Sequence, residues 1–299
     1  MLVLTRTDVE ELLDLDELLG ALARAHEELS AGMTSLPPRI AAFAGEAGLL
    51  GAMPGHLPSA GLGCKLVSLF PNNVDRPTHQ AAIILFDPAN GSPLALMDGT
   101  YITAMRTAAT AALAANLLAR DDARVLAIVG TGVQSRAAQE MFPRARAFTE
   151  IRVAGRGEHE EAVRGADVVH ACTHSPEPVV RREWIAPGTH VGSVGLNPAG
   201  AELDSALVDD ATLVVESRES AFAPPPTGAP ELAGRDPASA TELGEIVAGT
   251  QPGRTSADEI TLYKSVGVAV QDLAAAALVL SAAKERGAGL EVSLEEVPV

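Results

Sequence analysis

A glycine-containing turn between an apolar run and a helical pattern is the strongest chemical signal in this sequence. Residues 125–129 (VLAIV) are continuously apolar, and Gly130, Gly132 and Ser135 follow them at the spacing GxGxxS. In such a turn the first glycine permits the bend, the second lets the backbone approach a pyrophosphate, and the small third residue lets the helix pack on the strand. The amides at the helix start then face the phosphates. The pattern predicts a dinucleotide-binding loop, the alternative being a tight turn that binds nothing. The residues of this loop are Gly130, Thr131, Gly132, Val133, Gln134 and Ser135.

The next strand bears on which dinucleotide the loop would bind. Residues 150–153 are predicted as a strand that runs into the turn at Gly155, Arg156 and Gly157. NAD-preferring sites usually place Asp or Glu at this point for the ribose hydroxyls, and that acid is missing here. Because Arg156 could pair with a 2′-phosphate, we expect NADP(H) to be favoured over NAD(H). The alternative is a solvent-exposed arginine in a glycine turn.

Three basic residues stand in unusual surroundings. Arg39 follows two prolines, Lys65 lies in an apolar strand pattern, and Arg106 lies near the start of an Ala-rich helical segment. The helix dipole gives a cation no advantage at that end of a helix. Since an unpaired charge in apolar surroundings is costly, each must have a partner. The residues alone leave open an exposed loop arginine, a lysine that snorkels from a strand edge and an arginine in a structural ion pair.

The elements that position these residues follow from hydrophobic periodicity. Apolar and polar runs alternate from residue 124 onward in the βα pattern of a doubly wound parallel sheet, whereas residues 37–97 are rich in short strand patterns. The predicted strands of the parallel sheet are 124–129, 150–153, 168–172, 190–194 and 212–215. The predicted helices are 14–31, 102–120, 135–141, 158–165, 241–247 and 272–286. We expect the Pro-, Ala- and Gly-rich segment 223–240 to be a surface loop.

Composition excludes several classes of function. The chain has 22 Lys and Arg against 39 Asp and Glu, a formal charge of -17, which argues against nucleic-acid binding and against docking on anionic membranes. Three of the 22 basic residues are lysines, Lys65, Lys264 and Lys284. The two cysteines imply neither a disulfide framework nor a zinc site. The start of the chain has no signal-peptide pattern and no uncharged run reaches roughly 20 residues, so we expect a cytoplasmic protein.

Several short stretches are distributed along nearly the whole chain: residues 36–39 (LPPR), 53–54 (MP), 63–68 (GCKLVS), 98–109 (DGTYITAMRTAA), 130–134 (GTGVQ), 194–198 (VGLNP), 202–204 (ELD) and 261–267 (TLYKSVG). Taken together, they resemble the ornithine cyclodeaminase/μ-crystallin family. Each stretch is modest alone, but the combination and its order are specific. The resemblance implies a Rossmann-type doubly wound parallel sheet plus an α+β domain that binds substrate and dimerises. We place the substrate-binding and dimerisation domain at 1–118, with 272–299 returning to it, and the Rossmann domain at 119–271.

The family interconverts amines and imines at a carbon that bears a carboxylate, with a nicotinamide cofactor. The resemblance therefore implies that Arg39, Lys65 and Arg106 bind a substrate carboxylate, a task that suits cationic donors. Lys65 would also handle protons, because buried lysines shift their pKa readily. His79 follows Pro77-Thr78 and is expected to face the substrate, the alternative being an ordinary loop histidine.

Two departures from the family pattern concern acidic residues. Cyclodeaminases carry an aspartate in the loop 192–198, where this chain has Leu196 and Asn197, and an acid shortly before Met-Pro, where it has Gly51 and Ala52. Asn197 can hydrogen-bond in catalysis but cannot act as a base. Both departures weaken cyclodeamination, since a second substrate amine needs an anionic partner, and they leave hydride chemistry intact.

The resemblance implies further cofactor contacts at the ends of predicted strands. These are Cys172, Thr173, Val194, Gly195, Lys264 and Ser265. His170 and His174 flank Cys172, but this spacing without an acidic ligand makes a poor metal site, and we expect no metal. Glu202 and Asp204 are interpreted mainly as capping a helix start. Only residues 156–166 separate the second and third Rossmann strands, so the Rossmann half should be trimmed there.

The sequence thus predicts an NAD(P)H-dependent reductase or dehydrogenase of a small imino or amino acid, and a homodimer. One alternative is an amino-acid cyclodeaminase that retains its cofactor through turnover. A second is a non-catalytic, crystallin-like protein that binds NADP.

Overall fold

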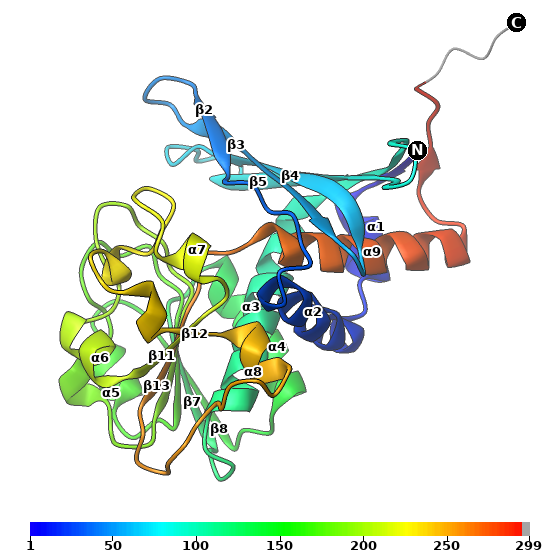
Figure 1. The fold of residues 1–299 in the computed structure, drawn as a ribbon. Coiled ribbons are helices and arrows are strands. Elements are labelled where there is room, and N and C mark those ends of the chain that lie inside the picture. Colours follow the sequence, from blue (N-terminus) through cyan, green and yellow to red (C-terminus); the bar gives the residue numbers. More distant parts are fainter. Residues whose placement is uncertain (295–299) are drawn as a thin grey trace, which may run out of the picture. The chain divides into compact units, whose positions relative to one another are not determined.

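The computed structural model describes residues 1–294 and forms two compact units (Figure 1). The first unit comprises Met1–Arg106 together with the C-terminal segment that begins at Ala269. The second unit is Thr107–Val268, so it is inserted into the sequence of the first. The roles predicted for domains 1–118 and 119–271 stay a prediction.

The first unit is built on a seven-stranded sheet in the order β14-β1-β6-β5-β4-β3-β2. Its strands are antiparallel except that β1 and β6 run parallel. This confirms the strand-rich reading of residues 37–97. The strands are β1 (Leu2–Leu4), β2 (Ile40–Phe43), β3 (Leu49–Leu57), β4 (Gly61–Leu69), β5 (His79–Phe86), β6 (Pro93–Asp98) and β14 (Leu290–Glu291).

Helices cover one face of this sheet. α9 (Ala269–Arg286) runs along β3, β4 and β5, and α2 (Leu15–Ser30) packs on α9 (Figure 1). α2 begins as predicted, because the Asp14 carboxylate accepts from the amides of Asp16 and Glu17. The remaining helices are α1 (Arg6–Leu12) and α3 (Gly99–Leu118), whose last twelve residues belong to the second unit.

The two faces of the first sheet differ in what covers them. On β4, Gly63 and Lys65 are buried on the face that meets α9, whereas Leu62 and Leu66 are exposed on the opposite face. Strands alternate their side chains between faces, so the register extends this opposite face across β2 to β5. We call it the outer face. Its apolar and small residues are Ile40, Ala42, Leu50, Ala52, Pro54, Leu62, Cys64, Leu66, Ala82, Ile84 and Phe86, and the polar residues His56, Ser68 and Gln80 share the face.

The second unit is a doubly wound parallel sheet, as predicted. The strand order is β12-β11-β13-β10-β9-β7-β8 and every pair is parallel. β7 has β8 on one side and β9 on the other, so the strand order reverses at β7. Ligands of such sheets bind beyond the carboxyl ends of the strands at this reversal. The strands are β7 (Val125–Val129), β8 (Glu150–Ala154), β9 (Val168–Ala171), β10 (His190–Ser193), β11 (Thr212–Val215), β12 (Thr241–Glu242) and β13 (Thr261–Lys264).

The helices of this unit are short, with one exception. α4 (Val133–Ala145) follows β7, and only α5 (His159–Val163) lies between β8 and β9, which confirms the trimmed connection. The others are α6 (Ser205–Asp210), α7 (Arg218–Ala221), α8 (Leu243–Val247) and the 3₁₀ helices η1 (Arg182–Trp184), η2 (Pro230–Leu232) and η3 (Pro237–Ser239).

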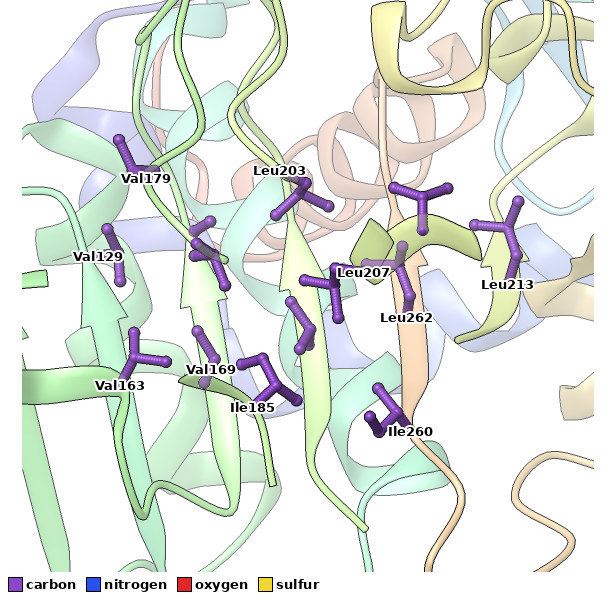
Figure 2. Packing of buried hydrophobic residues seen from close by; sticks show 14 of the residues in the cluster. Val129, Val163, Val169, Val179, Ile185, Leu203, Leu207, Leu213, Ile260 and Leu262 are labelled. Atoms are coloured by element: carbon purple, nitrogen blue, oxygen red, sulfur yellow. The ribbon is translucent and has the colours of Figure 1, made fainter. Parts of the chain in front are cut away.

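Apolar side chains from the strands and the connecting segments pack on one face of the parallel sheet (Figure 2). Val129, Val169 and Leu262 come from strands, and Val163 and Leu207 come from helices that cover them. Burying such a side chain fully contributes about 1.5–3 kcal/mol, so this cluster fixes the strand ends beside it.

The segment 223–240 was predicted to be a surface loop, and this was wrong in part. It contains η2 and η3, and Ala229, Leu232 and Ala240 belong to the buried cluster. Its proline content signalled a break in regular structure, but three separated apolar residues gave no periodic signal of burial. Within residues 1–294, no helix is long and apolar enough to cross a membrane.

Candidate functional site

The turn between β7 and α4 has the geometry of a phosphate-binding loop. Gly130 has φ +130°, and a Cβ there would lie 3.0 Å from both the carbonyl oxygen and the Sγ of Cys172. A Cβ on Gly132 would meet nothing within 4 Å, so space is open above this residue. Gly132 is also the N-cap of α4, and no side chain caps the helix there. These features fit a pyrophosphate on the first amides of α4.

Neighbouring residues complete this loop. Ser135 is buried in the first turn of α4, and its Oγ and the Oε1 of Gln134 have no hydrogen-bond partner among residues 1–294. Cys172 follows β9, and its thiol donates to the carbonyl of Val129 at 3.4 Å. Burial raises the pKa of Cys172 to about 12, so the thiol stays protonated and lines the loop without acting as a nucleophile.

The turn after β8 holds an acid that the sequence prediction missed. Arg156 is exposed in this turn, as expected. The carboxylate of Glu158 folds back and accepts from the amide of Gly155 at 2.9 Å. A Cβ on Gly155 would lie 3.4 Å from that carboxylate and 3.6 Å from Cγ2 of Thr131 in the phosphate loop. Sequence position hid this acid, because it follows the strand end by four residues and reaches it only through the turn.

The loop after β10 is held by Glu202, which is buried. One carboxylate oxygen accepts from the Ser193 hydroxyl and the Gly195 amide, both at 2.7 Å. The other accepts from the amide and the hydroxyl of Thr173, both at 2.9 Å. Interpreting Glu202 as a helix cap was therefore wrong, whereas Asp204 does cap α6 by accepting from the amide of Ala206 at 3.0 Å.

Asn197 lies in this loop and forms an isolated β-bridge with Gly200. Its side-chain amide donates to the carbonyl of His174 at 3.0 Å, and its side-chain oxygen accepts from the amide of Ala199 at 2.9 Å. Both groups thus stabilise the loop itself. Val194 follows β10, and its amide donates to the carbonyl of Ala171 at 3.0 Å.

Lys264 supports the same loop from β13. It is fully buried, and its ammonium donates to the Ser193 hydroxyl at 2.9 Å and to the carbonyl of Gly195 at 2.6 Å. It also pairs with Glu231 of η2 at 3.1 Å. The lysine predicted to touch cofactor therefore has three protein acceptors. Glu231 was not identified from the sequence, since it lies in the segment expected to be a surface loop.

Ser265 follows β13 and precedes the segment that returns to the first unit at Ala269. Its hydroxyl donates to Oε1 of the buried Glu216 at 3.1 Å, and the amide of Val266 donates to the same oxygen at 2.8 Å. The amide of Gly267 is a third donor. Burial raises the pKa of Glu216, and these hydrogen bonds oppose that rise.

In the first unit, a buried group of charges surrounds Asp272. Lys65 and Arg106 are 3% and 5% exposed, and Asp272 is 1% exposed. The Lys65 ammonium lies 2.7 Å from one oxygen of Asp272, and Nε of Arg106 donates to the other at 3.0 Å. These two ion pairs join β4, α3 and α9. Asp272 is therefore the partner that the sequence analysis required for the buried cations Lys65 and Arg106.

Two further side chains interact with this group, and we call the whole set the cation cluster. It comprises Arg39, Lys65, His79, Arg106 and Asp272. Burial lowers the pKa of Lys65 to about 8, with Asp272 raising it and Arg106 and Arg39 lowering it. Burial, followed by the charges of Lys65 and Arg106, lowers the pKa of His79 to about 4. His79 is therefore neutral at pH 7, and Asp272 is the acid whose charge acts on Lys65 within this cluster.

The cation cluster brings together four residues singled out in the sequence, Arg39, Lys65, His79 and Arg106, all in the first unit. Asp272 was missed, although a single acid at the start of an Ala-rich helix is the counterpart of the signal that identified Arg106. Within residues 1–294, no group of three or more His, Cys, Asp or Glu is arranged to hold a metal ion.

Comparison with known proteins gives matches along the chain. The profile of the Ornithine cyclodeaminase/mu-crystallin family matches residues 1–160 and 153–287. The ketimine reductase mu-crystallin of Mus musculus is 38% identical over 285 residues, which cover 88% of this chain and 89% of that protein.

Solved structures resemble the whole chain as well. The Thermococcus litoralis Delta(1)-pyrroline-2-carboxylate reductase, in complex with NADH and L-proline, has a TM-score of 0.87 at 35% identity, over 98% of this chain and 100% of that one. An archaeal alanine dehydrogenase dimer with bound NAD has a TM-score of 0.90 at 32% identity, over 99% of each chain.

Proposed function

Because the chain belongs to the ornithine cyclodeaminase/mu-crystallin family, we propose that it reduces a small imino acid to the amino acid with a nicotinamide dinucleotide. The observation that carries this proposal is the cation cluster, in which the buried Lys65 and Arg106 are held together on Asp272 and the charge of Arg39 acts on Lys65. Cationic donors of this kind bind a carboxylate through charge-assisted hydrogen bonds, so the cluster suits a substrate that carries a carboxylate. The relatives described above, which reduce imines or dehydrogenate an amino acid, support the same chemistry.

The cofactor fits the loop of the second unit. Gly130, Gly132 and Ser135 would hold the pyrophosphate, while the loop 193–195, held by Glu202 and Lys264, keeps its backbone in one conformation. When bound, the reduced nicotinamide supplies the hydride that the imine carbon accepts.

The residues of the first unit would bind substrate and manage its proton. Arg106 and Arg39 each carry a guanidinium, which can bind a carboxylate through two hydrogen bonds. Reduction of C=N also adds a proton to nitrogen. Lys65, with its pKa lowered to about 8, carries a proton at pH 7 and gives it up readily, so we assign it as the proton donor.

The cyclodeaminase alternative is weaker. It needs an anionic partner for a second substrate amine, and the loop 196–197 offers none, since both polar groups of Asn197 are engaged within the loop. The acids Glu202 and Glu231 near this loop are committed to backbone amides and to Lys264.

For the cofactor we propose a preference for NADP(H), carried by Arg156. Glu158 in the same turn opposes it, because a carboxylate there would repel a 2′-phosphate and favour the ribose hydroxyls of NAD(H). We expect Arg156→Ala to raise KM for NADPH more than for NADH, and Glu158→Gln to do the reverse. If Arg156→Ala raised KM equally for NADPH and NADH, the proposed preference for NADP(H) would be contradicted.

We further propose that the protein is a homodimer formed through the outer face. Contiguous exposed apolar residues mark interaction sites, and Leu50, Leu62 and Leu66 on this face are each more than a third exposed. The double variant Leu50→Glu, Leu66→Glu should be a monomer by light scattering. A wild-type monomer at micromolar concentration would contradict the proposal.

The enzyme proposal is tested by incubating the protein with pyrroline-2-carboxylate and either NADPH or NADH, and following the absorbance of the reduced cofactor. Steady loss supports reduction. Release of ammonia from ornithine or lysine without net loss of cofactor would indicate a cyclodeaminase. Cofactor binding without turnover of any imino acid would indicate a non-catalytic protein.

A further inference from the structure

Asp272 lies in the first turn of α9, and its carboxylate forms ion pairs with both Lys65 and Arg106 of the cation cluster. We propose that Asp272 is a positioning residue, which holds the Lys65 ammonium and the Arg106 guanidinium in the orientation that receives the substrate carboxylate. This inference rests on the proposed function. It adds a residue that touches neither substrate nor cofactor but acts through two that do.

The geometry supports this role because each oxygen of Asp272 has its own cation. Lys65 on β4 lies 2.7 Å from Oδ2, and Nε of Arg106 on α3 donates to Oδ1 at 3.0 Å. One rigid carboxylate thus sets the spacing between two long, flexible side chains. A pair that merely balanced charge would not need a separate oxygen for each cation.

Arg106 is also held along its second edge. Its Nη1 donates to Oε1 of Gln271 at 2.5 Å. The side-chain nitrogen of Gln271 is therefore the group that faces Nε2 of His26 on α2, at 3.1 Å, and it donates to that nitrogen. His26 must accept, which requires its neutral form. Burial, followed by the charge of Arg106, lowers the pKa of His26 to about 4, in agreement with this assignment.

Asp272 also sets the charge that surrounds Lys65. The groups that face Lys65 and Arg106 are Arg39 ahead of β2, His79 on β5, His26 on α2 and Asp272 on α9. His26 and His79 are neutral at pH 7, so Asp272 supplies the negative charge that raises the pKa of Lys65. Removing its charge lowers the pKa of Lys65 further, and Lys65 then loses its proton at a lower pH.

The test compares Asp272→Asn with wild type across pH, using pyrroline-2-carboxylate reduction and, independently, calorimetric binding of L-proline. An opposite charge at this distance shifts a pKa by about 1–3 units, so the alkaline limb of kcat/KM should move down by at least one pH unit. KM should rise at least about tenfold, since the two cations lose their common partner. Cofactor affinity should not change.

Two variants serve as controls. Glu285→Gln removes a carboxylate from the exposed end of the same helix and should match wild type. Asp272→Glu keeps the charge but displaces it, so its alkaline limb should stay near that of wild type while KM rises. An Asp272→Asn enzyme that is slower but has the wild-type limb and wild-type KM would overturn the proposal.

Folding and function are separated by two further outcomes. If Asp272→Asn does not fold, Asp272→Glu decides, because it keeps the charge but displaces the carboxylate: a raised KM supports the proposal and an unchanged KM contradicts it. A wild type that binds proline without reducing any imino acid would defeat the proposed function alone. A wild type that binds no amino or imino carboxylate would defeat both.

Discussion

At the scale of single residues, the choice of lysine over arginine at position 65 is informative. The chain uses three lysines, and two of them are buried at the sites described here, Lys65 and Lys264. An ammonium can lose its proton when buried, whereas a guanidinium in a protein stays charged. The lowered pKa of Lys65, to about 8, matches a residue that gives a proton near neutral pH.

Replacing Lys65 with Arg tests this reading. The variant keeps the positive charge but removes the proton donor, and general acid–base catalysis contributes about 10²–10⁴-fold. We therefore expect kcat to fall at least a hundredfold, with the affinity for NAD(P)H unchanged. Stopped-flow measurement of cofactor oxidation and a fluorescence titration check both. Near-normal kcat would show that Lys65 provides charge alone.

Sequence reasoning was good at finding charged residues in apolar surroundings and poor at finding their partners. Lys65 and Arg106 stood out because their neighbours along the chain are apolar. Asp272 pairs with Arg106 from 166 residues away, a distance at which sequence spacing carries no information about contact. Glu216 and Glu231 were missed for the same reason, since their donors lie 49 and 33 residues away along the chain. Glu158 was missed because it reaches the strand end only through a turn.

At the scale of elements, the β7–α4 turn contains two glycines with different roles, one in folding and one in binding. Gly130 adopts φ +130° and would contact Cys172 through any Cβ, whereas Gly132 has open space. Gly130 is needed to form the turn, and Gly132 is needed to leave space for the cofactor pyrophosphate that we propose binds there.

These two glycines should therefore respond differently to substitution. Gly132→Val should weaken NAD(P)H binding by at least about tenfold, or 1.4 kcal/mol, with little change in Tm. Gly130→Ala should lower Tm as well, because a side chain in that conformation costs about 1–3 kcal/mol. Isothermal titration and differential scanning fluorimetry measure both. A Gly130→Ala variant as stable as wild type would contradict this account.

The pairing of η2 with β13 gives a second prediction at this scale. Lys264→Met would leave the Glu231 carboxylate buried beside the loop 193–195 without its cation. Breaking one side of a buried ion pair costs about 3–5 kcal/mol, which urea denaturation would detect. The double variant Lys264→Met, Glu231→Gln should recover part of the loss. If it is no more stable than Lys264→Met, the pair is not what holds η2.

Element positions were predicted best where a periodic pattern was long. Five of the parallel strands and α9 came within a few residues of their observed bounds, because continuous apolar runs and an Ala-rich stretch are strong signals. The short strands β12 and β13 were not predicted. η2 and η3 were missed, since one turn of 3₁₀ helix has no period to detect.

At the scale of the whole molecule, the acidic balance of -17 coexists with buried cations, because the acids lie mostly on the surface and the cation cluster is inside. Buried histidines add a second electrostatic feature. Burial lowers the pKa of His170 to about 4 and that of His190 to about 3, and both are fully buried in the second unit.

These histidines predict how stability depends on pH. An unfolded histidine binds a proton near pH 6.5, but the folded ones bind it only near pH 4 or below. Between those values the unfolded chain takes up protons that the folded chain does not. The free energy of unfolding should therefore fall as pH drops from 6.5 to 4.

The measurement is Tm against pH. His170→Phe keeps the ring contact with Phe142, at 4.9 Å between centroids, but cannot titrate, so its Tm should fall less between pH 7 and 5. His159→Gln, at a half-buried position, should change that slope less than His170→Phe does. A slope that is the same in His170→Phe and wild type would show that other groups govern the acid limb.

The insertion of the second unit between Arg106 and Ala269 has a consequence for how the chain is made. During synthesis, Lys65 and Arg106 emerge long before Asp272, and their common counter-charge arrives only with α9. The first sheet therefore lacks α9, the helix that covers it, until the 162 residues of the second unit have been translated. We expect the inserted unit to reach its native state first and the older, N-terminal segment to mature last, so nascent chains arrested before residue 269 should depend on chaperones.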